Sequence, residues 1–398
     1  METRNNLPIG VQSFEVLREG NYTYVDKTEY LYDIVSNYRQ VFLSRPRRFG
    51  KSLLLSTLRA YWEGKKDLFT GLAIEELMEQ KGLVWKKHPV FYFDFNRDNY
   101  SDVNALDGIL EAHVSKWEKE YDIASTDDEV SLSVRFQNLL VAAHEYTGLR
   151  CVVLVDEYDK PLLDVIQEPD IEKRNKDIFK GFFSALKSYD EHLEFVFLTG
   201  VTKFSKVSIF SDLNQLKDIS MSPEYAGLCG MTDAEVNKYF TDEIDAMASG
   251  LDIEHEACRQ ELGRYYDGYR FHQNGPSVYN PFSIFNAFSD KEFRSYWFST
   301  GTPTFLVRLI RSKNFSIKQF TDDSFTATAS DLSDYQADNP ELVPLLYQTG
   351  YLTIRDYDKE GGFYTLAFPN DEVKYGLLES LLPEYSAGTE AGSGKSIA

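Results

Sequence analysis

The sequence predicts an α/β fold in which helices cover both faces of a parallel sheet. Four apolar runs of strand length occur in the first half of the chain, at residues 40–44, 89–96, 151–157 and 193–200. Stretches with helical periodicity separate them. Strands that are apolar on both faces and alternate with helices are typical of a parallel sheet buried on both sides.

Helices are expected between these strands, at residues 51–62, 101–121, 130–146 and about 170–189. From about residue 227 the strand pattern ends, and new helical stretches begin at Thr232 and Glu254. A run of helices without strands after an α/β core indicates a helical lid.

The last part of the chain predicts a smaller α+β unit. Helices are expected near 303–312 and 339–348, then two strands joined by the turn at 359–362, then a helix over 371–382. Helices followed by a hairpin suggest a winged-helix-like unit. We therefore expect a core at 1–226, a helical lid at 227–290, a winged-helix-like domain at 291–385 and a disordered tail at 386–398.

Charge argues against a general nucleic-acid binder. The chain has 63 Asp and Glu against 42 Lys and Arg, a formal net charge of -21. Such a field repels phosphate backbones, so any DNA contact has to be local.

The sequence also argues against a membrane or secreted protein. The longest apolar runs, such as 151–155, are far shorter than the roughly 20 residues of a membrane helix. No basic and apolar leader opens the chain, and three widely spaced cysteines do not form a disulfide framework. We expect a soluble, cytoplasmic protein without membrane contact.

A phosphate-binding loop is predicted where the first strand gives way to a helix. Gly50, Lys51 and Ser52 stand at that junction. Gly50 lets the backbone approach an anion, and the free N–H groups of the helix N-terminus point at it. Lys51 would neutralise the β- and γ-phosphates, and the Ser52 hydroxyl would coordinate Mg²⁺. The core is therefore predicted to be a P-loop NTPase.

The loop departs from the usual GxxxxGK[ST] pattern because Arg45 replaces the first glycine. Two further arginines, Arg47 and Arg48, and the aromatic Phe49 complete the loop. We expect these residues to contact the nucleotide. The alternative is a solvated basic patch, or arginines that bind acidic neighbours.

An acidic pair, Asp156 and Glu157, ends the third strand. Strand ends are where α/β sheets place their chemistry. Asp156 fits a residue that holds Mg²⁺ through a water molecule, and Glu157 fits a base that orients and polarises the attacking water. The alternative is a strand that simply runs into a polar loop.

One strand, at 89–96, lies between the loop strand and the acidic strand in sequence, as in ATPases where an extra strand separates the two in the sheet. Thr199, at the end of the fourth strand, could hydrogen-bond the γ-phosphate or the attacking water. The alternative is a threonine that satisfies local backbone.

Several segments together resemble the AAA-ATPase-like family of bacterial P-loop ATPases. The resemblance runs from about residue 7 to beyond residue 350, and the arginine-rich loop is similar to the pattern of that family. The segments that carry it are YVDKTEYL at 24–31, FLSRPRRFGKSLLLSTL at 42–58, VVLVDEYDKPL at 152–162, FLTGVTKFSKVSIFSDLNQLKDIS at 197–220, YYDGYRF at 265–271 and YNPFSIFNAF at 279–288.

The resemblance implies further features. It places Asp26 and Lys27 near the nucleotide, on the adenine side, although the residues alone suggest a helix start. It makes Arg270 a candidate for sensing the γ-phosphate, although a turn glycine between core tyrosines is the alternative. Members typically carry a PD-(D/E)XK nuclease-like domain after these parts, and we expect none in this chain, which has only a small polar tail after Tyr385.

The leading hypothesis is an ATPase that uses ATP and Mg²⁺ as a nucleotide-driven switch. The competing hypothesis is a scaffold that hydrolyses slowly or not at all and recognises a protein or DNA partner. Glu157 favours the first, since a pure binder does not require it. Candidate partners are a protein, a second copy of the chain, and DNA contacted locally through the C-terminal units.

Overall fold

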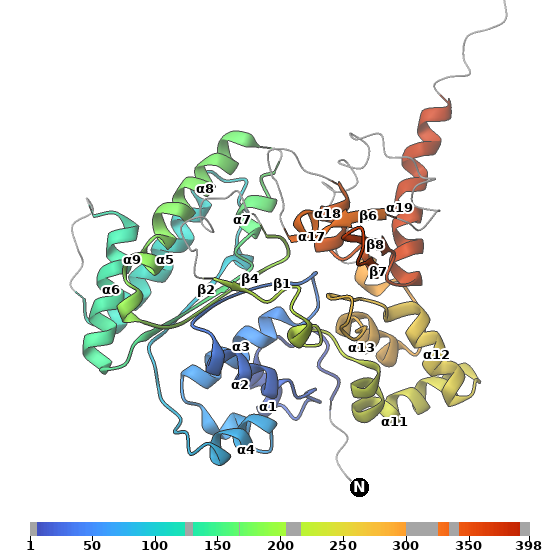
Figure 1. The fold of residues 1–398 in the computed structure, drawn as a ribbon, viewed down its shortest axis with the longest axis horizontal. Coiled ribbons are helices and arrows are strands. Elements are labelled where there is room, and N and C mark those ends of the chain that lie inside the picture. Colours follow the sequence, from blue (N-terminus) through green and yellow to red (C-terminus); the bar gives the residue numbers. More distant parts are fainter. Residues whose placement is uncertain are drawn as a thin grey trace, which may run out of the picture.

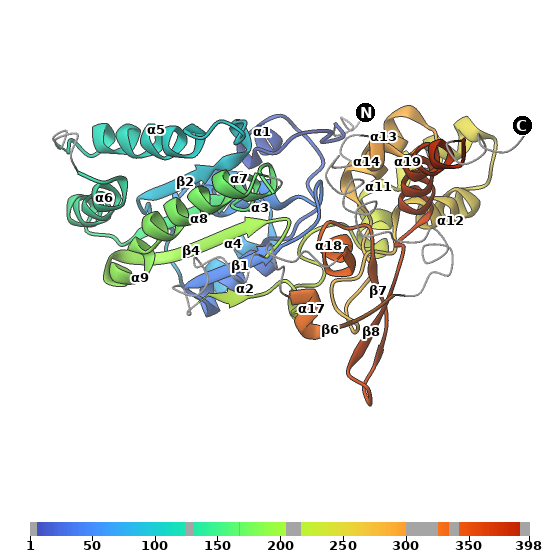
Figure 2. The ribbon, with the colours of Figure 1, turned by 90° about the horizontal axis from the view of Figure 1, so that it is seen from above.

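The computed structural model describes residues 6–123, 130–166, 168–203, 216–299, 325–333 and 342–390. Figure 1 shows two parts side by side. The first holds a sheet with helices on both faces. The second holds the later helices and a small second sheet, and Figure 2 shows the same division from above.

The main sheet has five parallel strands in the order β2-β3-β4-β1-β5. The four predicted strands are confirmed with small differences at their ends. The fifth was not predicted, because two residues carry no pattern. The bounds are β1 Gln40–Ser44, β2 Val90–Asp94, β3 Cys151–Asp156, β4 Leu193–Gly200 and β5 Lys217–Asp218.

The strand order places β4 between the strand of the phosphate loop, β1, and the acidic strand, β3. An extra strand was expected between them, and it is β4. Strand β2, which lies between them in sequence, is instead the edge strand beyond β3. All six residues of β3 are buried, as a strand covered on both faces requires.

Helices cover the two faces in two groups. Figure 1 shows α1 to α4 on one side of the sheet and α5, α6, α8 and α9 on the other. The bounds are α1 Phe14–Glu19, α2 Thr28–Asn37, α3 Lys51–Trp62, α4 Ala73–Gln80, α5 Ala105–Glu120, α6 Leu132–Thr147, α7 Lys160–Leu163, α8 Pro169–Phe183 and α9 Ala185–Ser188. Single 3-10 turns are η1 Lys66–Phe69, η2 Phe95–Arg97, η3 Asp190–His192 and η4 Pro223–Tyr225.

An aromatic cluster packs the second helix group onto the sheet. Phe93 of β2 lies 5.0 Å from Trp117 of α5, 5.4 Å from Phe136 of α6 and 5.5 Å from Phe182 of α8, all centroid to centroid. Each fully buried aromatic side chain contributes about 1.5–3 kcal/mol. One strand residue thus anchors three helices.

Residues 227–290, the helical segment, follow the main sheet. The bounds are α11 Asp233–Leu251, α12 His255–Tyr266 and α13 Pro281–Asp290. Thr232 and Glu254, the predicted starts, are the N-cap residues of α11 and α12. Thr232 forms a capping box with Glu235, whose carboxylate accepts from the Thr232 N–H at 2.8 Å. The predicted helical character of this segment is confirmed.

The described part of residues 291–390, the C-terminal segment, holds a three-stranded antiparallel sheet in the order β6-β8-β7. Figure 2 shows the β7–β8 hairpin projecting from it. The hairpin was predicted and β6 was not. The bounds are α14 Tyr296–Ser299, β6 Phe325–Thr328, α17 Ala329–Ser333, α18 Leu342–Gln348, β7 Thr353–Asp358, β8 Phe363–Ala367 and α19 Asp371–Glu390.

Helix α19 continues past its predicted end at residue 382, so residues 386–390, expected in a disordered tail, are helical. The helix predicted near 303–312 and the tail residues 391–398 lie outside the described residues. Among the helices that the structure describes, none is long and apolar enough to cross a membrane.

Gly268 joins the helical segment to the C-terminal segment. Its φ is +98°, and a Cβ at this position would fall well inside the van der Waals distance of the Pro369 carbonyl oxygen. Pro369 lies between β8 and α19. The backbones of the helical and C-terminal segments are therefore in direct contact here. Only glycine accommodates both the left-handed backbone and this approach.

We expect Gly268→Ala to destabilise the fold more than Gly148→Ala. Gly148 also has a positive φ, +66°, but nothing lies within 4 Å of its added Cβ. Gly148→Ala therefore measures only the left-handed strain, about 1–2 kcal/mol. Gly268→Ala should add about 1–3 kcal/mol of overpacking. Urea unfolding followed by circular dichroism measures both, and equal losses would contradict the close approach.

Candidate functional site

The phosphate loop has an open helix N-terminus. Gly50, with φ +93°, is the N-cap of α3, and no side chain caps the helix there. Nothing lies within 4 Å of an added Cβ, so the space above Gly50 is free of protein atoms. The preceding Arg48 also has a positive φ, +68°. Non-glycine residues in this region concentrate at functional sites.

Lys51 lies at the centre of the site and is 4% exposed. Its ammonium donates to the carbonyl oxygens of Arg45 and Pro46, at 3.1 and 3.2 Å. It also lies 3.4 Å from a carboxylate oxygen of Glu157. The loop lysine and the predicted base therefore meet, although 106 positions separate them in the sequence (157 − 51).

Asp156, the last residue of β3, is 2% exposed. One carboxylate oxygen accepts from the Tyr92 hydroxyl at 3.2 Å, and the other is buried without a partner among the described residues. Burial and the neighbouring charge of Glu157 raise the pKa of Asp156 to about 6, while Ser52 and Lys51 act in the opposite direction. The carboxylate is thus held beside the loop with one oxygen unused.

Glu157 adopts a left-handed backbone, with φ +52°. This conformation costs about 1–3 kcal/mol for a non-glycine residue. Its carboxylate side chain is 19% exposed, which leaves it in contact with solvent beside Lys51. The strained residue of this strand end is therefore the one predicted to act as the base.

Thr199 lies on β4, between the two functional strands, and pairs with Leu43 of β1. Its hydroxyl is fully buried and has no partner among the described residues. Thr199 does not line the cavity described below. A hydrogen bond from Thr199 to the γ-phosphate or to the attacking water therefore remains a prediction.

A cavity of about 590 Å³ opens above the loop. Six predicted site residues line it: Arg47, Arg48, Gly50, Lys51, Ser52 and Glu157. It also contains residues that sequence reasoning did not assign, namely Pro8 to Gln12, Leu53, Asn96, Lys160, Leu163, Asp164, Val201, Pro281, Phe282, Phe285 and Trp297.

The helical segment and Trp297 of the C-terminal segment supply the aromatic wall of this cavity. The Arg48 guanidinium lies 4.5 Å from the ring centroid of Phe282, and the Trp297 indole donates to the Arg47 carbonyl at 3.1 Å. Phe282 and Phe285 belong to the segment at 279–288 that carries part of the family resemblance. That segment was the available signal, but nothing in its spacing revealed the cavity.

Asp159 is a further residue that was missed. It is fully buried, and one of its carboxylate oxygens accepts from the N–H groups of Val201 and Thr202, at 3.0 and 2.6 Å. It ties the loop after β3 to the end of β4. Its place two residues after Glu157, in the same acidic run, was the signal.

The structure places the Arg45 side chain away from the cavity. The guanidinium is 1% exposed and donates to the carbonyl oxygens of Ser220 and Tyr225, at 2.7 and 3.0 Å. It stacks on Phe271, 4.0 Å from the ring centroid. Phe49 is also buried and packs 4.7 Å from Tyr269, centroid to centroid. Both expectations of nucleotide contact are corrected, because these side chains fill the core beneath the loop.

The structure also does not support the expectation that Asp26 lies near the nucleotide. Its carboxylate accepts from the N–H and hydroxyl of Thr28 at 2.8 and 2.7 Å, and from Ala73 N–H at 2.8 Å. It stabilises the start of α2, as the alternative from the residues alone held, and it does not line the cavity.

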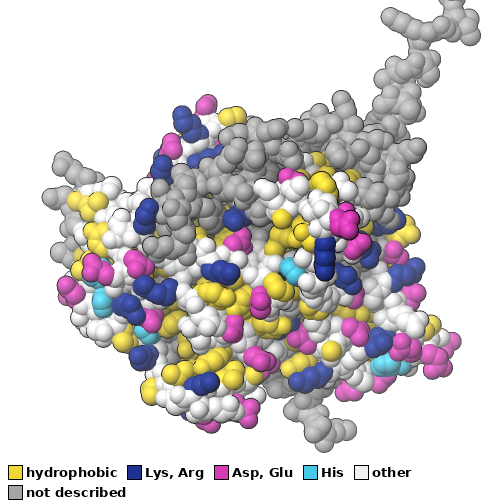
Figure 3. Space-filling model, in the orientation of Figure 1, with side chains coloured by type: hydrophobic (Ala, Val, Ile, Leu, Met, Phe, Trp, Pro, Cys, Tyr) yellow, Lys and Arg dark blue, Asp and Glu magenta, His cyan; other side chains and the backbone are white. Residues whose placement is uncertain are grey.

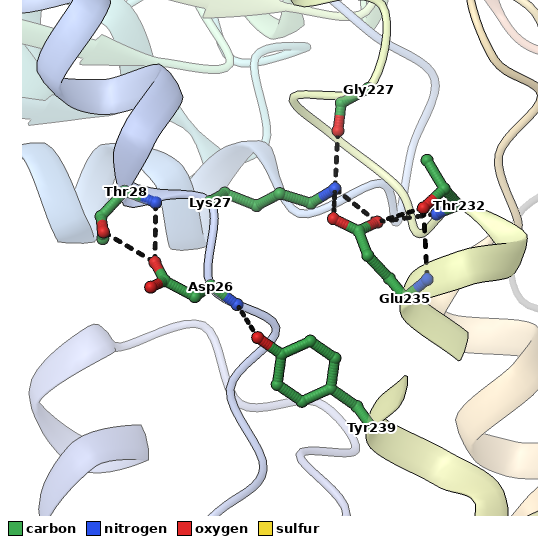
Figure 4. A network of polar contacts seen from close by, with 7 residues as sticks. All are labelled: Asp26, Lys27, Thr28, Gly227, Thr232, Glu235 and Tyr239. Atoms are coloured by element: carbon green, nitrogen blue, oxygen red, sulfur yellow. Dashed lines mark hydrogen bonds and ion pairs between the residues drawn. The ribbon is translucent and has the colours of Figure 1, made fainter. Parts of the chain in front are cut away.

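The neighbouring Lys27 joins the first part of the chain to the helical segment (Figure 4). Its ammonium lies 2.5 and 2.7 Å from the two carboxylate oxygens of Glu235, and 2.7 Å from the Gly227 carbonyl. The side chains are only 11% and 22% exposed. The motif at 24–31 is therefore a junction between the two parts.

The structure likewise does not support the expectation that Arg270 senses the γ-phosphate. It is exposed and lines a second cavity, whose residues do not line the first. Its backbone N–H donates to the Thr353 hydroxyl at 2.6 Å. The arginine thus sits where the helical and C-terminal segments meet, and the structure does not bring it to the phosphate loop.

We expect Lys27→Met to cost on the order of 3 kcal/mol, because it leaves a largely buried carboxylate unpaired. Glu235→Gln keeps the capping box. The double variant should lose much less stability than the sum of the losses of the two single variants. Urea unfolding of all four proteins gives the coupling energy. The exposed pair Arg294 and Glu292, with Arg294→Met and Glu292→Gln, is the control and should couple by no more than about 0.5 kcal/mol. If the stability losses of Lys27→Met and Glu235→Gln were additive, this would contradict a stabilising ion pair between the two parts.

A buried carboxylate holds the tryptophan of the cavity wall. Glu372 is 1% exposed and accepts from Trp297 N–H and the Ser283 hydroxyl, both at 2.7 Å. Burial raises the pKa of Glu372 to about 7. The folded protein therefore holds this proton more tightly than the unfolded chain does. As pH rises from about 4.5 to about 7, Glu372 lowers the free energy of unfolding.

Glu372→Gln should therefore gain stability relative to the parent as pH rises from 5 to 8, by on the order of 2–3 kcal/mol. Glutamine can still accept from Trp297 and bond Ser283. Glu379→Gln, at an exposed position of the same helix, is the control and should show a constant difference. Guanidinium unfolding at the two pH values makes the measurement. If the stability difference between Glu372→Gln and the parent did not change with pH, the raised pKa of Glu372 would be disproved.

Comparison with known proteins agrees with the geometry. A family model described as "Predicted AAA-ATPase" matches residues 8–210, which include the loop and both carboxylates. A protein of Azotobacter chroococcum mcd 1, described as an uncharacterized protein in the vnfD 5' region, is 40% identical over 388 residues. The alignment covers 96% of this chain and 71% of that protein. The resemblance inferred from sequence is confirmed, and the chain belongs to the AAA-ATPase-like family of predicted AAA-ATPases.

Proposed function

We propose that the chain binds ATP with Mg²⁺ in the 590 Å³ cavity and hydrolyses it. One observation carries the proposal. The loop lysine, Lys51, and the strand-end carboxylate of Glu157 lie 3.4 Å apart in one cavity, across an intervening strand. A phosphate-neutralising cation beside a base is the arrangement that phosphoryl transfer to water requires.

The loop would bind the phosphates through its backbone and its lysine. The uncapped N-terminus of α3 offers N–H groups, and its dipole favours an anion. Lys51 is already desolvated and held by two carbonyl oxygens, so a phosphate would replace neutral acceptors with charged ones. Arg47 and Arg48 line the same cavity and add positive charge.

The residues present fit a Mg²⁺ ion. Asp156 has a buried carboxylate oxygen without a partner among the described residues, and the Ser52 hydroxyl is close enough to this carboxylate to lower its pKa. Carboxylate, hydroxyl and water oxygens are the donors that Mg²⁺ accepts. When bound, the ion would neutralise charge that develops on the phosphates. Ser52 would be its ligand and Asp156 would act through water.

Glu157 would orient and deprotonate the attacking water. Its carboxylate is partly open to solvent and lies 3.4 Å from the Lys51 ammonium, where a water molecule can reach it. The left-handed backbone at Glu157 turns the residue away from the strand direction that Asp156 follows. The two neighbouring carboxylates can therefore take separate roles.

The cavity also has an apolar part that suits a nucleotide base. Pro8 and Ile9 line it from the N-terminal segment, and Phe282 and Phe285 line it from α13. Aromatic and aliphatic side chains are the usual lining of such pockets. No NKxD-like guanine reader stands out in the sequence, which favours ATP over GTP.

We further propose that nucleotide state shifts the helical segment as a lid, together with a winged-helix-like C-terminal segment. Trp297 and Phe282 contact the phosphate loop from these segments, so a change in the loop reaches them directly. Buried, unpaired cysteines at 151, 229 and 258 support a cytoplasmic location.

A protein partner or a second copy fits such a switch better than DNA does. The projecting hairpin carries exposed Asp356, Asp358 and Glu360, which would repel a phosphate backbone. On the face that Figure 3 shows, basic and acidic side chains are interspersed and no broad basic area forms.

The test is phosphate release and nucleotide binding by the parent and two variants. Lys51→Ala should weaken binding of Mg-ATP by about 10- to 100-fold, because it removes charged hydrogen bonds. Glu157→Gln should keep nearly the parent affinity and lose on the order of 10²- to 10⁴-fold in turnover.

Lys66→Ala and Glu145→Gln, at exposed positions outside the cavity, are the controls and should behave as the parent. Binding without turnover in the parent would favour the slowly hydrolysing scaffold. No binding in the parent would refute the proposal.

A further inference from the structure

A second cavity, of about 520 Å³, lies between the helical and C-terminal segments. The end of α12, the turn at 267–270, strand β7 and the start of α19 all contribute to it. Its charged lining residues are Arg264, Arg270, Arg355, Lys374, Asp267 and Asp371. None of its lining residues belongs to the first cavity.

The wall of this cavity is positive, with four cations against two carboxylates. Arg264 pairs with Asp371 at 3.3 Å, and two further guanidinium groups, Arg270 and Arg355, line the cavity together with the second carboxylate, Asp267. In a chain with a formal charge of -21, such a local excess of cations is unexpected. The N-terminus of α19, a helix of 20 residues, adds the positive end of its dipole.

The backbone around these cations is fixed. The Arg270 N–H donates to the Thr353 hydroxyl at 2.6 Å, and that hydroxyl lies 3.2 Å from the Arg270 carbonyl. The Asn370 amide donates to the Asp267 carbonyl at 2.8 Å. The Arg355 guanidinium donates to the Phe368 carbonyl at 2.9 Å. A pre-formed frame lowers the entropic cost of binding a ligand.

Donors remain available in this frame. Only one Arg355 nitrogen has a recorded acceptor, and within the described ranges the Arg270 guanidinium has none. Two guanidinium groups with free N–H donors match the oxygens of a phosphate, which accepts paired hydrogen bonds. The cavity therefore offers charge, geometry and room for a phosphate group.

The surroundings limit the ligand to a compact one. Exposed Asp356, Asp358 and Glu360 follow Arg355 along the hairpin, and Glu256 and Glu261 lie on α12. A polyanion that extended beyond the cavity would meet these carboxylates and be repelled. We propose that this second cavity binds a compact phosphate-bearing anion between Arg270 and Arg355. The proposal does not depend on ATP hydrolysis.

Isothermal titration of the full chain with inorganic pyrophosphate tests the site. To remove the first cavity from the signal, we would use the Lys51→Ala variant and, in parallel, the parent saturated with a non-hydrolysable ATP analogue. Both should retain one binding site for pyrophosphate. The substitution pair Arg270→Gln and Arg355→Gln, added to each, should weaken it by at least about tenfold. Thermal unfolding checks that the variants fold.

Arg259→Gln with Arg294→Gln is the matched control, since both arginines lie nearby and outside the cavity. A phosphoserine peptide and a 20-nucleotide single-stranded DNA form two further arms. Binding of pyrophosphate or of the peptide that is lost in the Arg270 and Arg355 variant supports the site, and their relative affinity identifies the source of the phosphate. No binding, binding that survives both substitutions, or tighter binding of DNA would overturn the proposal.

Discussion

The contact between Lys51 and Glu157 depends on one constraint, the burial of parallel strands on both faces. A strand such as β3, with all six residues buried, cannot slip in register without exposing its side chains to helices that no longer fit them. The fixed order β3-β4-β1 therefore brings the carboxyl ends of β3 and β1 to the same edge. The lysine after one strand and the carboxylate after the other meet at 3.4 Å as a consequence.

Arg45 occupies the position where the usual phosphate-loop pattern has its first glycine, and its side chain is buried. Burial lowers the pKa of the guanidinium, but arginine stays charged, so the charge needs acceptors. Carbonyl oxygens of Ser44, Ser220 and Tyr225 supply them, and Phe271 covers one face. A glycine at this position could not make these contacts, whereas the Arg45 side chain fixes the loop to the core beneath it. Its backbone carbonyl then remains in place to hold Lys51.

Sequence reasoning succeeded where the signal was local. Apolar runs located β1 to β4, the caps Thr232 and Glu254 located two helices, and strand ends located the acidic pair. It failed where side-chain direction or distant contacts decide the outcome. Arg45 and Arg48 look equivalent in sequence, yet one points into the core and the other lines the cavity. Phe282 contacts Arg48 although 234 positions separate them in the sequence (282 − 48), and residues 8–12 line the same cavity as the loop. No periodicity in the sequence predicts such neighbours.

The turn at 267–270 lies between the phosphate loop and the second cavity, because two of its successive side chains point in different directions. Tyr269 points toward Phe49 of the phosphate loop, at 4.7 Å between ring centroids, whereas the next residue, Arg270, lines the second cavity. Gly268 before them has no free space, because Pro369 lies against it. A turn that is packed on both sides cannot absorb a displacement within itself. Any movement of the phosphate loop at Phe49 must therefore either be resisted by the C-terminal segment or move that segment with it.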